Sequence, residues 1–75
     1  MTEEDMADIL ESQLDALEKA GIDMYSEQRC FYVGEWLIAF EGVYVANQRH
    51  PGVLDEADVK TLVDYFGVDM SELDQ

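Results

Sequence analysis

Residues 34–47, with the sequence GEWLIAFEGVYVAN, decide the fold of this chain of 75 residues. The segment contains the only Trp of the chain and carries only two charges, at Glu35 and Glu41. A helix that turns by about 100° per residue gathers one apolar face here, made of Trp36, Phe40, Val43 and Tyr44, with Leu37 at its edge. Ile38 and Val45 lie on roughly the opposite side, so neighbouring elements must cover the helix on both sides.

Residues 3–20 give the clearest helical pattern outside this segment. Apolar side chains recur there at intervals of three and four residues, at Met6, Ile9, Leu10, Leu14 and Leu17. Thr2 can cap the first turn, with Asp5 completing a near-capping box, and Gly21 provides a natural end. The sequence therefore predicts an amphipathic first helix.

A shorter helix is predicted over residues 27–33, with Ser26 as its cap. Phe31 and Cys30 then point inward, and Gly34 breaks the helix before the central segment. The run CFYV is also compatible with a strand, because aromatic and β-branched residues favour strands.

The central helix is predicted over residues 35–48. Gly42 in its interior costs about 1 kcal/mol relative to Ala, which indicates a neighbouring helix packed closely at that position. Ile38 and Val45 lie on the same side as Gly42, and we expect them in the core. The alternative is a dimer contact or a partner surface formed by Ile38 and Val45.

The last long helix is predicted over residues 55–66. Asp55 caps it, and Leu54 and Val59 can form a hydrophobic staple across its first turn. The tail is expected to add one more turn over residues 71–74.

The whole chain, residues 1–75, is expected to form one acidic all-α domain. Its architecture is predicted to be a small bundle of about four helices around a central apolar helix, at roughly 3–20, 27–33, 35–48 and 55–66. The hydrophobic content of 48% suffices for one core. A chain of this size buries only about 60% of its unfolded surface, so its stability is expected to be modest.

The charge of the chain is strongly one-sided. Eighteen Asp and Glu against four Lys and Arg give a net charge of -14, which opposes compaction through self-repulsion. One interpretation is a surface that keeps the protein in solution. The other is a field directed at a basic protein partner. Direct binding to nucleic acid or to an anionic membrane is disfavoured, because phosphate contacts need Lys and Arg.

One face of the first helix carries charges of a single sign. On a helical wheel these acids fall within about 80° opposite the apolar stripe, at Glu4, Asp8, Glu11, Asp15 and Glu18. The carboxylates repel one another, and only Lys19 lies close enough to relieve them. Because a solvated face usually mixes signs, this pattern favours recognition of a basic partner. Tyrosines often anchor such charged interfaces, but we expect Tyr32 and Tyr44 in the core and Tyr65 nearer the surface.

The sequence contains no motif for catalysis or metal binding. It has no phosphate-binding Gly loop, no Cys–His cluster and no H-E-x-x-H, and the acids of VDMSELD lack the spacing of a calcium loop. Cys30 is expected to be a buried, inert thiol and His50 an exposed turn residue. We therefore expect a non-enzymatic protein without cofactor or metal. Without a signal peptide or an apolar run long enough to span a bilayer, the expected compartment is the cytoplasm.

The segment GEWLIAFEGV resembles the MafI-type immunity proteins of bacterial polymorphic toxin systems. Those proteins are short, acidic and helical, with a G-E-[WY]-x-x-A-[FL]-E motif, matched here by Gly34, Glu35, Trp36, Ala39, Phe40 and Glu41. The resemblance covers about half of the chain, including the loop and the helix at 55–66. It does not extend to the acidic first helix, so it implies a role and not a set of binding residues.

What the resemblance implies is a cytoplasmic antitoxin that binds a cognate toxin domain tightly, with no turnover and no cofactor. Toxins of this kind are often nucleic-acid-directed enzymes with basic clefts, and an anionic surface speeds association with such a cleft. The acids predicted to pair with Lys or Arg of the toxin are first Asp8, Glu11, Asp15 and Glu18 and second Asp55 and Glu56. A monomer is favoured.

Two other functions fit the same chain. A nucleic-acid mimic of phage or plasmid origin, such as an anti-CRISPR or restriction inhibitor, would use carboxylates on a rigid helix to imitate a phosphate track. A small regulatory or scaffold subunit would instead dimerise through Ile38, Gly42 and Val45. Gene position separates the first two functions, because an immunity gene directly follows a toxin gene whereas a mimic lies among phage genes.

Overall fold

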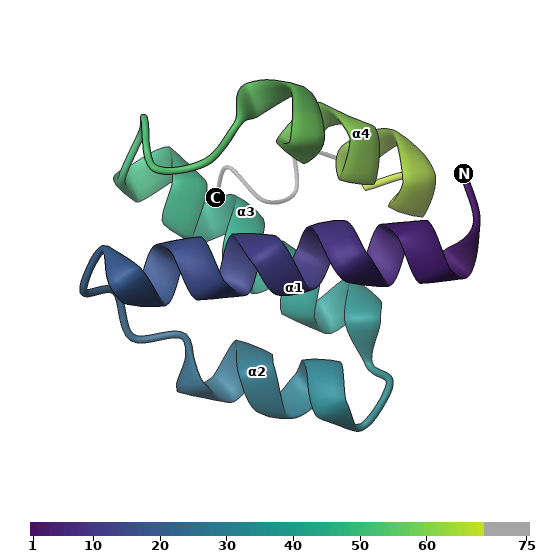
Figure 1. Ribbon diagram of the computed structural model, residues 1–75, viewed down its shortest axis with the longest axis horizontal. Coiled ribbons are helices and arrows are strands. Elements are labelled where there is room, and N and C mark those ends of the chain that lie inside the picture. The colour runs from purple at the N-terminus through teal and green to yellow at the C-terminus, as the bar shows by residue number, and fades with distance from the viewer. Residues whose placement is uncertain (69–75) are drawn as a thin grey trace.

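Four α-helices make up the computed structural model, which describes residues 1–68 (Figure 1). They are α1 (Glu3–Lys19), α2 (Tyr25–Tyr32), α3 (Trp36–Arg49) and α4 (Glu56–Phe66). No strand occurs among these residues, so the predicted all-α fold of four helices is confirmed and the run CFYV is helical up to Tyr32. The turn predicted at 71–74 lies outside the described residues.

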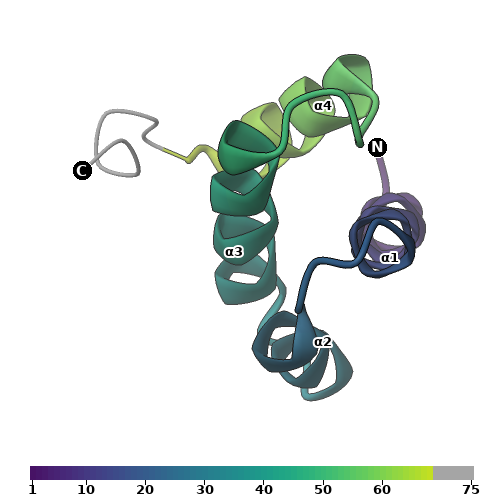
Figure 2. The same cartoon turned by 90° about the vertical axis from the view of Figure 1, so that its left-hand side faces the viewer.

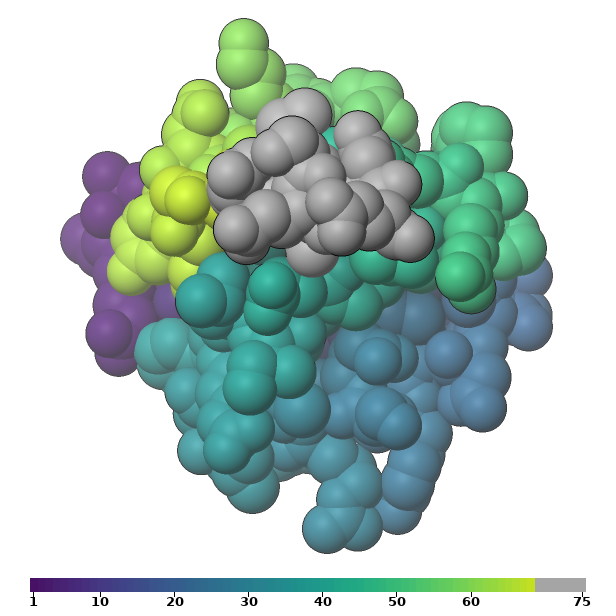
Figure 3. Space-filling model, turned by 180° about the vertical axis from the view of Figure 1, so that it is seen from behind, coloured from purple at the N-terminus to yellow at the C-terminus, as the bar shows by residue number. Residues whose placement is uncertain are grey.

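Two helices, α1 and α3, share the centre of the fold. Each of them contacts the other and also both α2 and α4. In Figure 1, α1 crosses the front of the molecule with α4 on one side, α2 on the other and α3 behind. Figure 2 shows α1 end-on and α3 along its length between α2 and α4. From behind, in Figure 3, the teal atoms of α3 cross the middle of the molecule.

The core lies between the inner faces of these helices. It is formed by Met6, Leu10, Leu14, Leu17, Met24, Ala39, Phe40, Val43, Tyr44, Ala46, Leu54, Val59 and Leu62. Phe40 is fully buried, and its ring stacks on that of Phe66 with centroids 5.4 Å apart. The prediction that Phe40, Val43 and Tyr44 belong to the core is confirmed.

The ends of α1 and α4 are set by side chains next to the first turn. The Thr2 hydroxyl accepts the Asp5 backbone N–H at 3.1 Å, and the Asp5 carboxylate reciprocates at the Thr2 N–H, which confirms the capping box. The Asp55 carboxylate accepts the Ala57 backbone N–H at 2.8 Å, so Asp55 caps α4 as predicted.

The start of α2 differs from the prediction. Ser26 does not cap a helix at residue 27, because α2 already begins at Tyr25. The Asp23 carboxylate accepts the Tyr25 backbone N–H at 3.0 Å and starts the helix early, in the manner of an Asx turn. Met24, just before the helix, is 2% exposed and anchors this end of α2 in the core.

Tyr32 lies on the surface, so the prediction that it belongs to the core is wrong. Its side chain is 82% exposed. An amphipathic helix of eight residues buries only one narrow face, and Gln28 and Phe31 occupy that face half-buried. Cys30 is also half-buried, so its thiol is less enclosed than predicted.

The outer side of α3 also departs from the prediction. Ile38 is 53% exposed and Val45 is half-buried, so the prediction that this side of α3 is covered is wrong for Ile38. The close packing predicted at Gly42 is confirmed, because a Cβ atom there would lie 2.8 Å from Cδ of Glu27. The covering group is therefore one side chain of α2, which leaves Ile38 in contact with solvent.

Trp36 ties the second and third helices together. Its side chain is half-buried against the core, and its indole N–H donates to the backbone carbonyl of Phe31 at 3.1 Å. The Trp that opens the central segment therefore fixes the turn at Gly34, where φ is +83°.

Candidate interaction surface

The outer face of α1 carries a row of exposed acids. These residues, which we call the acidic stripe, are Glu4, Asp8, Glu11, Asp15 and Glu18. At a rise of 1.5 Å per residue, the stripe extends about 21 Å along the helix. The side chains that the sequence placed opposite the apolar stripe therefore all face solvent.

The acidic stripe is not neutralised by the protein itself. Within residues 1–68, no ion pair joins a Lys, Arg or His side chain to a carboxylate. Lys19, which was expected to relieve the repulsion within the stripe, forms an ion pair with none of its carboxylates. Arg29 is occupied elsewhere, because its guanidinium donates to the Tyr25 hydroxyl at 3.1 Å. The carboxylates of Asp8, Glu11, Asp15 and Glu18 have no hydrogen bond or ion pair in this part of the chain.

A groove lies between α1 and α2 beside the middle of the stripe. We call it the α1–α2 groove; its volume is about 240 Å³ and its lining is Glu11, Leu14, Asp15, Gln28, Phe31 and Tyr32. The rings of Phe31 and Tyr32 meet edge to face, with centroids 6.1 Å apart at 71°. One wall of the groove is therefore acidic and the other aromatic.

This combination suits a cationic side chain. Two carboxylates supply charge and hydrogen-bond acceptors, and an exposed ring supplies a face on which a cation can rest. Tyrosine with a charged surround is also frequent at protein interfaces. In the α1–α2 groove, two of the predicted acids, Glu11 and Asp15, lie beside side chains that are distant from them in the sequence.

The two acids predicted on α4 lie elsewhere. Asp55 caps α4 and lines a shallow groove of about 120 Å³ with Ser12 and Asp58. Glu56 accepts the Asn47 side-chain N–H at 3.3 Å and lines a groove of about 480 Å³ between α3 and α4. The six predicted acids therefore divide into four on the stripe, two of which line the α1–α2 groove, and two with local partners or roles on α4.

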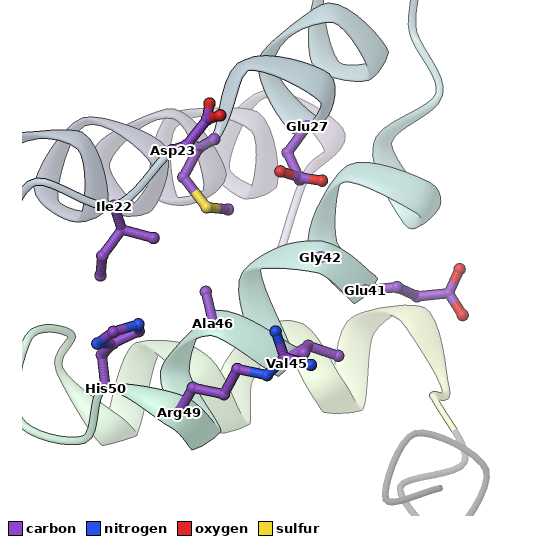
Figure 4. A pocket seen from close by; sticks show the side chains of 10 residues that line it. Ile22, Asp23, Glu27, Glu41, Gly42, Val45, Ala46, Arg49 and His50 are labelled. Atoms are coloured by element: carbon purple, nitrogen blue, oxygen red, sulfur yellow. The ribbon is translucent and has the colours of Figure 1, made fainter.

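Another groove, of about 510 Å³, lies between the α1–α2 connection, α2 and α3 (Figure 4). Its lining mixes signs, with Asp23, Glu27 and Glu41 on one part and Arg49 and His50 on another. His50 is exposed, as predicted, and no hydrogen bond among residues 1–68 joins it to an acid. The mixed charge makes this groove less suited to a basic partner than the α1–α2 groove.

Residues 1–68 offer neither a metal-binding cluster nor a helix fit to span a membrane. They contain no group of three or more His, Cys, Asp or Glu side chains that could hold a metal ion. Among the same residues, no helix combines the length and apolar composition that crossing a membrane requires.

The sequence missed the aromatic half of the α1–α2 groove. Gln28, Phe31 and Tyr32 were not among the predicted site residues, because their position beside Glu11 and Asp15 depends on how α2 packs against α1. The helical period fixes the angles between the side chains of α2 but not which of its faces turns toward α1. No local pattern in the sequence therefore marked this wall of the groove.

Comparisons of the chain with protein families, with curated proteins and with solved structures found no match. Membership of the MafI-type immunity proteins therefore stays a prediction, carried by the motif at residues 34–41.

Proposed function

We propose that this chain is an immunity protein, an antitoxin that binds and neutralises a cognate toxin domain in the cytoplasm of the cell that makes the toxin. It acts by binding alone, without enzymatic turnover or a cofactor. The observation that carries the proposal is the acidic stripe, whose carboxylates have one sign, are exposed and have no ion pair within residues 1–68.

A basic toxin domain is the partner that such a surface favours. Complementary charge steers encounter and raises association rates toward about 10⁸–10⁹ M⁻¹s⁻¹ at low salt, far above those of neutral surfaces. Toxins that act on nucleic acids need positive clefts for their own substrates. A carboxylate row on a rigid helix can therefore pair with Lys and Arg at or beside such a cleft.

Dimerisation as a scaffold subunit is less favoured. The exposed side chain of Ile38 offers apolar surface for a contact. A dimer, however, would bring together two chains that each carry a net charge of -14, and repulsion opposes that contact.

The test uses the gene that lies directly upstream. Its C-terminal domain is expressed with and without this chain, and growth and complex formation are measured. The proposal predicts that the domain is toxic alone, is neutralised by this chain, and forms a complex of fixed stoichiometry. A domain that is harmless, or that remains toxic and does not bind, would contradict the proposal. Inhibition of a restriction or CRISPR nuclease in a parallel assay would instead support the nucleic-acid mimic.

A further inference from the structure

We propose that the α1–α2 groove is a socket for an arginine side chain and that it prefers arginine to lysine. The inference rests on the proposed function in that it assumes a basic protein partner, and it names the side chain which that partner presents. It assigns a direct contact with an arginine of the partner to the acidic stripe, whose charge otherwise attracts the partner only at a distance.

The acidic wall provides the charge complementarity. Glu11 and Asp15 are one helical turn apart, a spacing that puts their Cβ atoms about 5–6 Å from each other. Neither carboxylate has a hydrogen bond or ion pair within residues 1–68. A guanidinium group presents five N–H donors in one plane and binds carboxylates through two parallel hydrogen bonds, whereas an ammonium is a point charge.

The aromatic wall provides the preference for arginine. Tyr32 is 82% exposed, so its ring is open to a ligand. Guanidinium is planar and weakly hydrated and stacks on aromatic faces more readily than the strongly hydrated ammonium of lysine. The same contact already occurs on the outer side of α2, where the guanidinium carbon of Arg29 lies 5.8 Å from the Tyr25 ring centre.

The size and floor of the groove fit one side chain. Its volume of about 240 Å³ is smaller than the several hundred Å³ typical of a small-molecule pocket. Leu14, which is 2% exposed, also lines the groove and closes it on the side of the core with an apolar side chain. Gln28 on α2 adds a side-chain amide with no hydrogen bond within residues 1–68, and its oxygen can accept one more N–H.

The first experiment is an NMR titration of the full ¹⁵N-labelled chain with two capped tripeptides, acetyl-Gly-Arg-Gly-amide and acetyl-Gly-Lys-Gly-amide, at low salt. We expect the arginine peptide to bind about two- to fivefold more tightly, in line with an exposed cation–π contact. The largest shift changes should fall on the Gln28 side-chain amide and the Tyr32 backbone. Equal affinities for the two peptides, or shift changes centred away from the groove, would overturn the inference.

Variants distinguish a specific binding site for arginine from a general attraction of cations to the acidic stripe. Glu11→Gln with Asp15→Asn should weaken the arginine peptide about tenfold, and Glu4→Gln with Asp8→Asn, which removes the same charge from the same stripe, should weaken it less than about twofold. Tyr32→Ala should abolish the preference for arginine and leave the lysine peptide unchanged. All five side chains are exposed, so the fold should persist, as circular dichroism can verify. Equal effects of the two charge pairs would overturn the inference.

Failure of this inference can be told apart from failure of the proposed function. If the tripeptides show no arginine preference while the upstream domain still forms a complex, only the socket is rejected. If the groove selects arginine but the upstream domain neither binds nor is neutralised, the immunity function is rejected and the socket stands.

Discussion

The helices α1 and α3 occupy equivalent positions in the fold, but apolar side chains are distributed differently over their faces. Each contacts the other three helices. On α1 the apolar and acidic side chains are separated, so its buried face and its outer face can be told apart in the sequence alone. On α3 apolar side chains lie on both sides, and the second side is covered only in part: Phe40 is fully buried, whereas Ile38 is 53% exposed.

The difference teaches how far a hydrophobic pattern fixes orientation. A helix with one apolar stripe has one way to turn toward a core. A helix with two apolar sides can turn either way, and its neighbours decide the outcome. Here α2 is short and covers α3 at Gly42 with the side chain of Glu27, which leaves Ile38 in the first turn of α3 exposed. Apolar character all round α3 therefore indicated more burial than occurs.

The largest expected effect is on the inner face of α3. Phe40→Ala removes a fully buried ring that stacks on Phe66 and should cost about 3–5 kcal/mol, enough to unfold most of a domain this small. Urea denaturation followed by circular dichroism measures the loss. A variant within about 1 kcal/mol of the parent would mean that α3 does not turn this face to the core.

A smaller effect is expected where α2 covers α3. Gly42→Ala gains about 1 kcal/mol of helix propensity but must displace the Glu27 side chain. The substitution should therefore be close to neutral in the parent chain and stabilising by about 0.5–1 kcal/mol when Glu27 is already Ala. The double-mutant cycle is measured by urea denaturation. Equal effects of Gly42→Ala in both chains would show that Glu27 does not cover this position.

The outer face of α1 should respond to charge and salt. Glu11→Gln with Asp15→Asn removes one repulsive pair four residues apart and should stabilise the fold by about 0.2–0.5 kcal/mol at low salt. The gain should shrink as salt screens the repulsion. Thermal melts at two ionic strengths measure it. A destabilised double variant would mean that these carboxylates have favourable partners within the fold.

A similarly small effect is expected on the outer face of α3. Ile38→Ala should change stability by no more than about 0.5 kcal/mol, because its side chain is largely exposed. Leu10→Ala on the inner face of α1 is the control and should cost about 2–5 kcal/mol. If Ile38→Ala costs as much as the control, the outer side of α3 is covered after all and the contrast between the two helices fails.

The sequence predicts most of the fold because its signals are local. The Thr2 capping box and the Asp55 cap act within a few residues, and they place the starts of α1 and α4 to within about one residue. The start of α2 was missed by two residues, because Asp23 competes with Ser26 for the same turn. Tyr32 was wrongly expected in the core for another reason, because so short a helix buries one narrow face and Phe31 occupies it.

The site could be predicted only in part for the same reason. The exposure of Glu11 and Asp15 follows from the periodicity of α1 alone. Their position beside Phe31 and Tyr32 depends on how α2 packs against α1, and no local pattern encodes that contact. Asp55 and Glu56 were grouped with the stripe because they are acidic and near a loop, whereas each has a local role on α4.

The most direct test of the account measures association rates with the domain encoded upstream. Glu11→Lys with Asp15→Lys is compared with Glu41→Lys with Asp64→Lys, since each pair changes the net charge from -14 to -10. At low salt the pair on the stripe should slow association about tenfold and the control pair less than about twofold, and the difference should fade near about 0.3 M salt. Equal rates for the two pairs would contradict the claim that the acidic stripe recognises the partner.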